Sequence, residues 1–267
     1  MALWMVSMAL SAEPIVVTTA SGGPAPLRSE VVLSWAEVGL RPAVPESPAI
    51  GPNLFAVGPA GSWAVYSPVG HRILTATSAW PVSGADGLAF TESGMVVVMD
   101  DRARVVRIFG EDGEIFDSLA FPAIVPAGGT LALRGATILS IDAFGNGHPL
   151  ATVDDRGALR APTKTTLMAP SRRVTRSGAS VVVDGRTVAT FAGKGGARLL
   201  GDWLLVESLG DNGASRAAIP LDGGAALTLP VRGRLYAPAQ DASAASDGSF
   251  GWMDPRTDGL HVVVVTP

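Results

Sequence analysis

The residues of this sequence with the greatest capacity for chemistry are carboxylates, because the chain has no cysteine and only three histidines. The histidines, His71, His148 and His261, stand far apart and in no metal-ligand spacing. No HExxH, GxSxG, SxxK, Walker or EF-hand motif occurs. The absence of cysteine excludes disulfides, zinc-thiolate sites and thiol nucleophiles. Any catalysis would therefore depend on aspartate and glutamate.

Most of the acids of interest belong to a short pattern that recurs six times. Each copy is a glycine, an apolar run and a final polar, usually acidic, residue. The offset from the glycine to the polar residue is six positions in five copies and seven in the third. The glycines are Gly61, Gly94, Gly135, Gly178, Gly201 and Gly248, and the polar residues are Ser67, Asp100, Asp142, Asp184, Glu207 and Asp254.

This pattern predicts a hairpin in each copy. The glycine takes the positive-φ turn position between two strands, and the apolar run is a strand buried on both faces. The acid stands where that strand ends, at a turn, and its carboxylate can accept hydrogen bonds from the backbone amides of that turn.

The spacings between successive glycines are 33, 41, 43, 23 and 47 residues, and most match a propeller blade. The sequence therefore predicts an all-β fold, a six-bladed β-propeller, with five or seven blades and a β-sandwich as alternatives. The 23-residue interval from Gly178 to Gly201 is too short for four strands. The blade beginning near Arg173 is accordingly expected to keep three strands, with residues 187–191 as the third.

In a propeller, equivalent strand ends lie on one face. The pattern thus predicts a binding rim formed by Asp100, Asp101, Asp142, Asp184, Glu207 and Asp254. A ring of carboxylates could attract a cation or a basic partner. The alternative, which we favour, is that each acid caps its own turn.

The second copy is the best preserved and covers residues 86–121. Strands are expected at 88–91, 96–100, 104–109 and 114–119. This segment resembles an NHL repeat, on the evidence of Asp100, Arg104, Val105, Phe109 and Gly113. The resemblance implies a six-bladed propeller that binds partners.

A second resemblance concerns a metal site. Asp86-Gly87-Leu88-Ala89-Phe90 is similar to a strand start in gluconolactonase-like propellers, where an asparagine at the first position is a ligand of a divalent ion. Asp86 could still bind a hard cation. The resemblance implies a metal-dependent hydrolase or lactonase as an alternative function. Apart from this divalent cation, no cofactor is expected.

The two ends of the chain predict closure of the last blade. Residues 31–38 should form a strand that pairs with 262–265 and supplies the missing fourth strand. Residues 30–267 would then be a single propeller domain, and 13–29 a loosely ordered arm. Residues 1–12 are apolar and resemble a signal peptide, which favours a periplasmic or secreted protein. No apolar run is long enough to span a membrane.

Charge is unevenly distributed along the chain. The net charge of −4 and the pI near 5.4 exclude nucleic acid as the expected partner. Residues 156–183 form a basic sector that contains six basic residues and no acidic residue: Arg156, Arg160, Lys164, Arg172, Arg173 and Arg176. It could hold an anionic polymer, a lipid surface or an acidic protein, or it could be an ordinary solvated region.

Two expectations complete the prediction. Trp63, Trp203, Phe250 and Trp252 should pack between blades, whereas Trp80, beside Pro81, should be the most exposed tryptophan. The favoured function is non-catalytic binding or scaffolding, with a protein or polysaccharide partner. A metal-dependent hydrolase and a structural module of a larger assembly are the alternatives.

Overall fold

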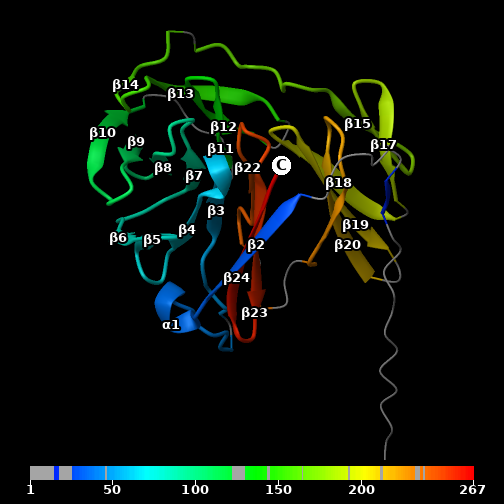
Figure 1. The fold of residues 1–267 in the computed structure, drawn as a ribbon, viewed down its shortest axis with the longest axis horizontal. Coiled ribbons are helices and arrows are strands. Elements are labelled where there is room, and N and C mark those ends of the chain that lie inside the picture. Colours follow the sequence, from blue (N-terminus) through cyan, green and yellow to red (C-terminus); the bar gives the residue numbers. More distant parts are fainter. Residues whose placement is uncertain are drawn as a thin grey trace, which may run out of the picture. The chain divides into compact units, whose positions relative to one another are not determined.

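The computed structural model describes residues 15–17, 26–45, 47–121, 130–142, 145–163, 165–191, 193–210, 213–231, 235–236 and 238–267. These residues form six four-stranded sheets (Figure 1). The helical segments are short, namely α1 (Trp35–Val38) and a 3-10 turn (Pro59–Gly61). Six four-stranded antiparallel meanders are the blade architecture of a six-bladed β-propeller, which confirms the predicted fold class. Within the described part of the chain, no helix has the length and apolarity to cross a membrane.

The chain divides into two compact units. The larger unit comprises Ala25–Ser171, Leu200–Asp202 and Arg232–Pro267. The smaller unit comprises Met1–Pro24, Arg172–Leu199 and Trp203–Val231.

The larger unit contains four sheets. The first has β3 (Leu54–Val57), β4 (Trp63–Ser67), β5 (Arg72–Thr75) and β6 (Ala79–Pro81). The second has β7 (Gly87–Phe90), β8 (Val96–Asp100), β9 (Val105–Phe109) and β10 (Ile115–Ala120), within one residue of the predicted bounds at each end. The third has β11 (Thr130–Arg134), β12 (Thr137–Ile141), β13 (Gly147–Val153) and β14 (Leu159–Arg160). The fourth has β22 (Ala242–Ala244), β23 (Phe250–Arg256), β24 (Gly259–Thr266) and β2 (Leu27–Leu33).

The smaller unit contains two sheets. One has β15 (Val174–Ser177), β16 (Ser180–Val183), β17 (Arg186–Thr190) and β1 (Val16–Val17). The other has β18 (Lys194–Leu200), β19 (Trp203–Gly210), β20 (Gly213–Pro220) and β21 (Leu227–Leu229). The expectation that the blade near Arg173 has three strands is therefore wrong. Its own segment does supply three, but β1 pairs with β17 and adds a fourth from the N-terminal arm.

The six repeat glycines occupy equivalent turns. Each lies between the first and second strands of its sheet, counted from the inner strand, and each has a positive φ, between 55° and 88°. Glycine adopts this conformation without the steric cost that a Cβ imposes. The predicted hairpin in every blade is confirmed.

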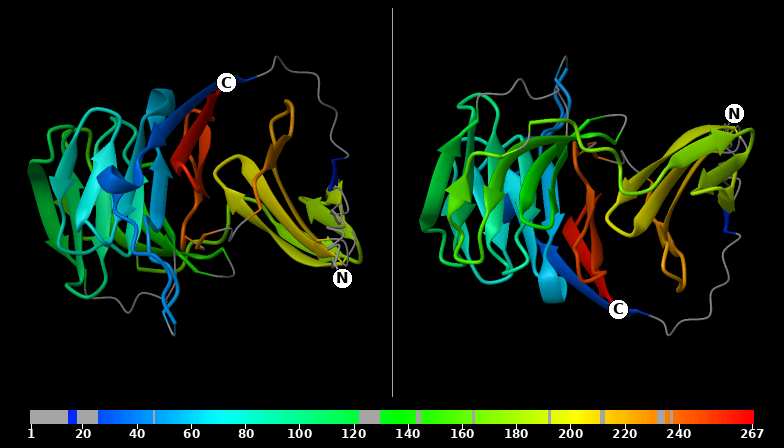
Figure 2. Two further views of the ribbon diagram at one scale, coloured as in Figure 1. Left: turned by 90° about the horizontal axis from the view of Figure 1, so that it is seen from below. Right: turned by 90° about the horizontal axis from the view of Figure 1, so that it is seen from above.

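The strand after each glycine is rich in apolar residues, and in β8 every residue is buried. In β8, Val97 packs in a cluster with Ile138 of the third sheet, whereas Val98 packs in a cluster with Ile73 of the first. Successive side chains of a strand point to opposite faces, so consecutive valines meet different neighbouring sheets. Burial of each valine is worth roughly 1.5–3 kcal/mol. Figure 2 shows these sheets of the larger unit packed beside one another.

The N-terminal strand closes the last sheet, as predicted, with Val31 opposite Val262. However, the strand ends at Leu33, and the expected pairing of residues 34–38 is wrong. Ser34 is the N-cap of α1, and its side chain and that of Glu37 form a reciprocal capping box. The caps satisfy backbone N–H groups that a helix leaves open, and so they turn the chain into a helix here.

Trp80 is buried, with 5% of its surface exposed, so the expectation that it is the most exposed tryptophan is wrong. Its ring stacks on Phe109 at a centroid distance of 6.2 Å. Gly113, with φ +83°, lies against the same indole. The β9–β10 turn therefore covers a tryptophan that stands beside a proline in sequence.

Candidate binding rim

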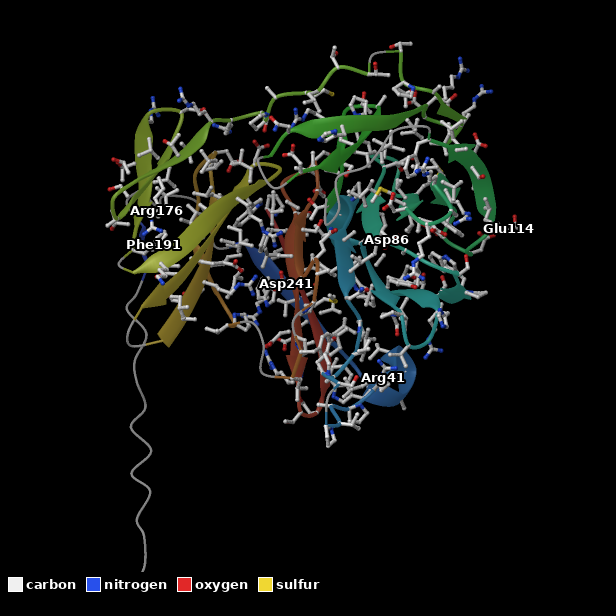
Figure 3. The ribbon with its side chains drawn as sticks, turned by 180° about the vertical axis from the view of Figure 1, so that it is seen from behind. Arg41, Asp86, Glu114, Arg176, Phe191 and Asp241 are labelled. Atoms are coloured by element: carbon white, nitrogen blue, oxygen red, sulfur yellow. The ribbon has the colours of Figure 1, made fainter. Side chains whose placement is uncertain are left out.

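In the larger unit, a polar rim lies where three inner strands begin. Asn53, Asp86 and Asp241 each come directly before an inner strand, β3, β7 and β22 respectively. A parallel bridge between Leu54 and Gln240 brings the starts of β3 and β22 together. Because the sheets are antiparallel, the end of each second strand lies at the same edge. Asp86 and Asp241 are labelled in Figure 3.

Asp86 and Asp100 brace the turn that follows β8. Asp86 Oδ2 accepts the backbone N–H of Asp101 at 2.9 Å. Asp100 is buried, accepts the N–H of Ala103 at 2.9 Å through Oδ1, and lies 3.4 Å from Arg107 Nη1 through Oδ2. The structure thus brings the sequence-predicted residues Asp86, Asp100 and Asp101 together, within one turn.

Tyr66, at the same edge, is a buried phenol. Desolvation by burial raises the pKa of Tyr66, and the negative charges of Asp86 and Asp100 add to this, while a backbone hydrogen bond at Ala85 opposes it. A raised pKa keeps the hydroxyl protonated at neutral pH. Tyr66 is therefore suited to hydrogen bonding and not to acting as a base.

Gln240 was not identified from the sequence, yet it connects three inner strands. Its backbone N–H donates to Asn53 O at 2.9 Å. Its side-chain Nε2 donates to Phe55 O of β3 at 2.8 Å and to Leu88 O of β7 at 3.3 Å. Gln240 Oε1 and Asn53 Oδ1 are buried with no hydrogen-bond partner among the described residues.

Asp241 is 1% exposed, and its backbone carbonyl accepts the N–H of Met253 at 2.8 Å. A lone Gln-Asp pair in a polar connection carries no sequence signal, because only the tertiary fold places it beside β3 and β7.

Asp142 follows β12 and binds its own turn. Its carboxylate accepts the Asn146 backbone N–H at 2.9 Å and the Asn146 side-chain amide at 3.1 Å. His148 Nε2 lies 3.3 Å from Oδ2. The acid is positioned at a strand end, as the repeat predicts.

Asp184 and Glu207 belong to the smaller unit. Asp184 follows β16 and has a φ of 48°, which aspartate tolerates better than most residues. It accepts the Arg173 N–H at 2.9 Å and lies 3.7 Å from Arg172 Nη1. Glu207 lies inside β19, 2.8 Å from Arg216 Nε on the adjacent strand.

The expectation that Glu207 and Asp254 mark strand ends is wrong. β19 continues to Gly210 and β23 to Arg256. Glu207 stands directly opposite Arg216, and Asp254 accepts Arg256 Nε at 2.6 Å. Opposite charges at such positions let an acid remain inside a sheet.

The predicted basic sector is divided between the units. Arg156 and Arg160 lie in the larger unit and Arg172, Arg173 and Arg176 in the smaller, while Lys164 lies outside the described residues.

Arg176 supports a hairpin. Its guanidinium donates to the carbonyls of Gly178, Gly193 and Gly195 at 2.9, 2.6 and 3.0 Å. It also lies 4.5 Å from the ring centroid of Phe191 (Figure 3). These contacts give Gly193 and Gly195 a structural role at the start of β18.

A group of three or more histidine, aspartate or glutamate side chains arranged to hold a metal ion does not occur among the described residues. Asp86 is exposed, and one of its oxygens already accepts a backbone amide.

A second surface feature lies on the outer strand of the β7–β10 sheet. Ile115 and Phe116 are 58% and 61% exposed, and the register shifts between Ile115 and Asp117, so that Phe116 occupies a β-bulge. Glu111 and Glu114 beside them are exposed and form no ion pair with any described residue. Figure 3 shows Glu114 at the outer margin of its sheet. We call Glu111 to Phe116 the β9–β10 tip.

No family model matches this chain, and no curated protein matches it. Solved structures do resemble it. One is a catalytically inactive virginiamycin B lyase from Staphylococcus aureus with quinupristin, 11% identical, covering 90% of this chain and 89% of that chain, with a TM-score of 0.41. Another is a member of the DUF4221 family from Bacteroides vulgatus, 10% identical, covering 96% of this chain and 98% of that chain, with a TM-score of 0.39. At these values the likeness carries no activity or ligand to this chain.

Proposed function

We propose that this protein is a non-catalytic binding propeller that docks a partner protein through the β9–β10 tip. The observation that carries the proposal is the pair of large apolar side chains, Ile115 and Phe116, exposed at the tip. Single exposed apolar residues are normal on protein surfaces, but two large adjacent ones at the start of an outer strand favour an interface. Aromatic residues are enriched in such interfaces.

The bulge supports docking by side chains. It turns Phe116 out of the pairing with β9, and Ser118 N–H is occupied by the Asp117 carboxylate at 2.7 Å. Both features blunt the edge of β10 against addition of another strand. Burial of each apolar side chain in a partner pocket would contribute roughly 1.5–3 kcal/mol.

The charge at the tip suggests the chemistry of the partner. Glu111 and Glu114 present carboxylates that no described cation neutralises. A complementary surface would be an apolar pocket bordered by lysine or arginine, since such pairs raise the association rate and select the partner. An anionic membrane would be repelled by this tip.

The hydrogen bonds of the rim acids support a role in stability for those residues. Asp86, Asp100 and Asp142 accept hydrogen bonds from backbone amides of their own turns.

We also propose that the protein is exported, on the basis of apolar residues 1–12, which lie outside the described residues.

The proposal is tested by site-specific photo-crosslinking in an extract of the native host. A photoreactive residue replaces Phe116 in one protein and Leu209, an apolar residue 59% exposed on β19, in a control. We expect position 116 to capture a protein that position 209 does not. That protein, once purified, should bind Phe116→Ser at least 10-fold more weakly than wild type. Equal capture at both positions, or unchanged binding by Phe116→Ser, would refute the proposal.

A further inference from the structure

The outer strands of the six sheets differ in how well they could accept another strand. β1 and β14 have two residues each, β6 and β21 have three, and β10 is bulged. β2 has seven residues and pairs with β24 in a continuous register. Natural proteins protect sheet edges by keeping them short, bulged or irregular. Five of the six outer strands follow this rule, and β2 does not.

β2 is also exposed. It pairs on one side only among the described residues, and its first six residues are all exposed. They include the apolar side chains of Leu27, Val31 and Val32, which are 74%, 40% and 51% exposed. A long, regular edge with exposed apolar side chains favours pairing with another chain.

The sequence of β2 is complementary to itself in one antiparallel register. Centred on Ser29, this register places Arg28 opposite the second copy's Glu30, and Leu27 opposite its Val31. Centring the pair on Glu30 would instead oppose two carboxylates. Cross-strand pairs of opposite charge and of apolar side chains stabilise a sheet, and like charges destabilise it.

Glu30 is already held in place for such a pair. Its Oε1 is bound by His261 Nδ1 at 2.7 Å, and its Oε2 is 3.1 Å from Arg28 Nη2 of the same chain. Pro26, one residue before the strand, has no N–H to donate and would end the ladder.

We propose that β2 is a homodimer interface, in which the β2 strands of two copies pair in antiparallel fashion about a two-fold axis at Ser29. The two four-stranded sheets then form one sheet across the dimer. This inference is independent of the β9–β10 tip. The two-fold symmetry requires the same surface on both copies, which the palindromic order of charges and apolar residues supplies.

Cysteine substitution tests the register, because the chain has no native cysteine. At the axis the two Cα atoms of residue 29 would be about 4.5–5.5 Å apart, within disulfide range. We expect the full-length Ser29→Cys protein to form a disulfide-linked dimer under mild oxidation. Ser118→Cys, on exposed β10, is the matched control and should remain uncrosslinked. Failure of Ser29→Cys to crosslink, or equal crosslinking of both, would overturn the proposal.

Charge reversal gives a second test, with mass measured by light scattering. Wild type should have twice the 27.3 kDa of one chain. Arg28→Glu and Glu30→Arg should each shift the protein to monomer, and an equimolar mixture should restore the dimer because each reversed charge meets its opposite. Arg160→Glu on β14 should leave the mass unchanged. Melting temperatures of all variants exclude misfolding as the cause. A monomeric wild type, or a mixture that stays monomeric with both variants folded, would refute the pairing.

Discussion

Gly113 and Gly94 offer a matched pair of substitutions that separates backbone strain from packing. Both glycines lie in turns of the β7–β10 sheet, with φ values of +83° and +86°. A Cβ at Gly94 would meet nothing within 4 Å. A Cβ at Gly113 would overlap the Trp80 indole and lie 2.6 Å from Trp80 Cβ. The two alanine variants therefore share the strain and differ in the clash.

The expected magnitudes follow from these contacts. The strain of a left-handed alanine costs about 1–2 kcal/mol, so Gly94→Ala should destabilise the protein by about that amount. Gly113→Ala adds the cost of overpacking, typically about 1–3 kcal/mol. Displacement of Trp80 from Phe109 would also weaken their stacking, worth about 0.5–1.5 kcal/mol. We expect Gly113→Ala to be the more destabilising by about 2–4 kcal/mol.

Urea denaturation, followed by circular dichroism and fluorescence, measures both free energies of unfolding, provided that the two probes give coincident transitions. Trp80→Ala should reduce the difference between the two alanine variants, because it removes Trp80 Cγ and Cδ2, two of the three atoms nearest to the new methyl group. A double-mutant cycle gives this coupling. Equal destabilisation by Gly94→Ala and Gly113→Ala would refute the reasoning, because strain alone would then account for both.

Three further predictions concern single side chains. The hydrogen bond from His261 lowers the pKa of Glu30 in the folded protein. The stability that Glu30 contributes is therefore present above its unfolded pKa near 4.5 and is lost as the pH falls through the lower folded value. The melting temperature of Glu30→Gln should accordingly depend less on acid pH than that of wild type. Gln240→Met should lower the free energy of unfolding by about 1–3 kcal/mol, because the carbonyls of Phe55 and Leu88 lose the hydrogen bonds that Gln240 Nε2 donates to them. An unchanged midpoint in a urea titration would contradict this prediction. Arg176→Met removes three hydrogen bonds from the guanidinium to backbone carbonyls, so amide hydrogen exchange in the β15–β16 and β17–β18 turns should increase. Unchanged exchange would contradict the structural role of Arg176.

The parts of the fold that the sequence predicted are those fixed by local chemistry. A positive-φ glycine followed by a run of valines specifies both a turn and a strand buried on two faces, as at Gly94 and β8. In the second, third and fourth copies the acid lies at the end of the strand or directly after it, as the repeat predicts. Closure by β2 was predicted from the missing strand of the last blade, which is a requirement of topology and not of any one residue.

The errors arose where tertiary contacts override local signals. Trp80 stands beside Pro81 in sequence, but the β9–β10 turn of the neighbouring sheet packs over its ring. Glu207 was taken for a strand end because acids favour turns, yet Arg216 on the adjacent strand neutralises it within the sheet. Residues 34–38 are apolar enough for a strand, but the Ser34–Glu37 capping box favours a helix.

The candidate rim was predictable only in part for the same reason. Asp100 was predicted at the rim from the repeat and Asp86 was singled out separately as a metal-ligand candidate, whereas Gln240 and Asn53 meet through a contact between residues 187 positions apart. Such contacts have no local pattern.

The rim and the outer strands differ in what a ligand would have to displace, and this difference bears on the proposed binding function. Rim acids such as Asp100 and Asp142 hold their own turns, so a ligand that took their carboxylates would have to replace bonds to backbone amides. An unsatisfied buried donor costs about 1–3 kcal/mol, which opposes such an exchange. Phe116 and the apolar side chains of β2 are exposed to water, so a partner could cover them without breaking a hydrogen bond of the protein. Binding at the outer strands gains apolar burial without breaking the turns that define each blade, and this asymmetry favours the outer strands as the interaction surfaces.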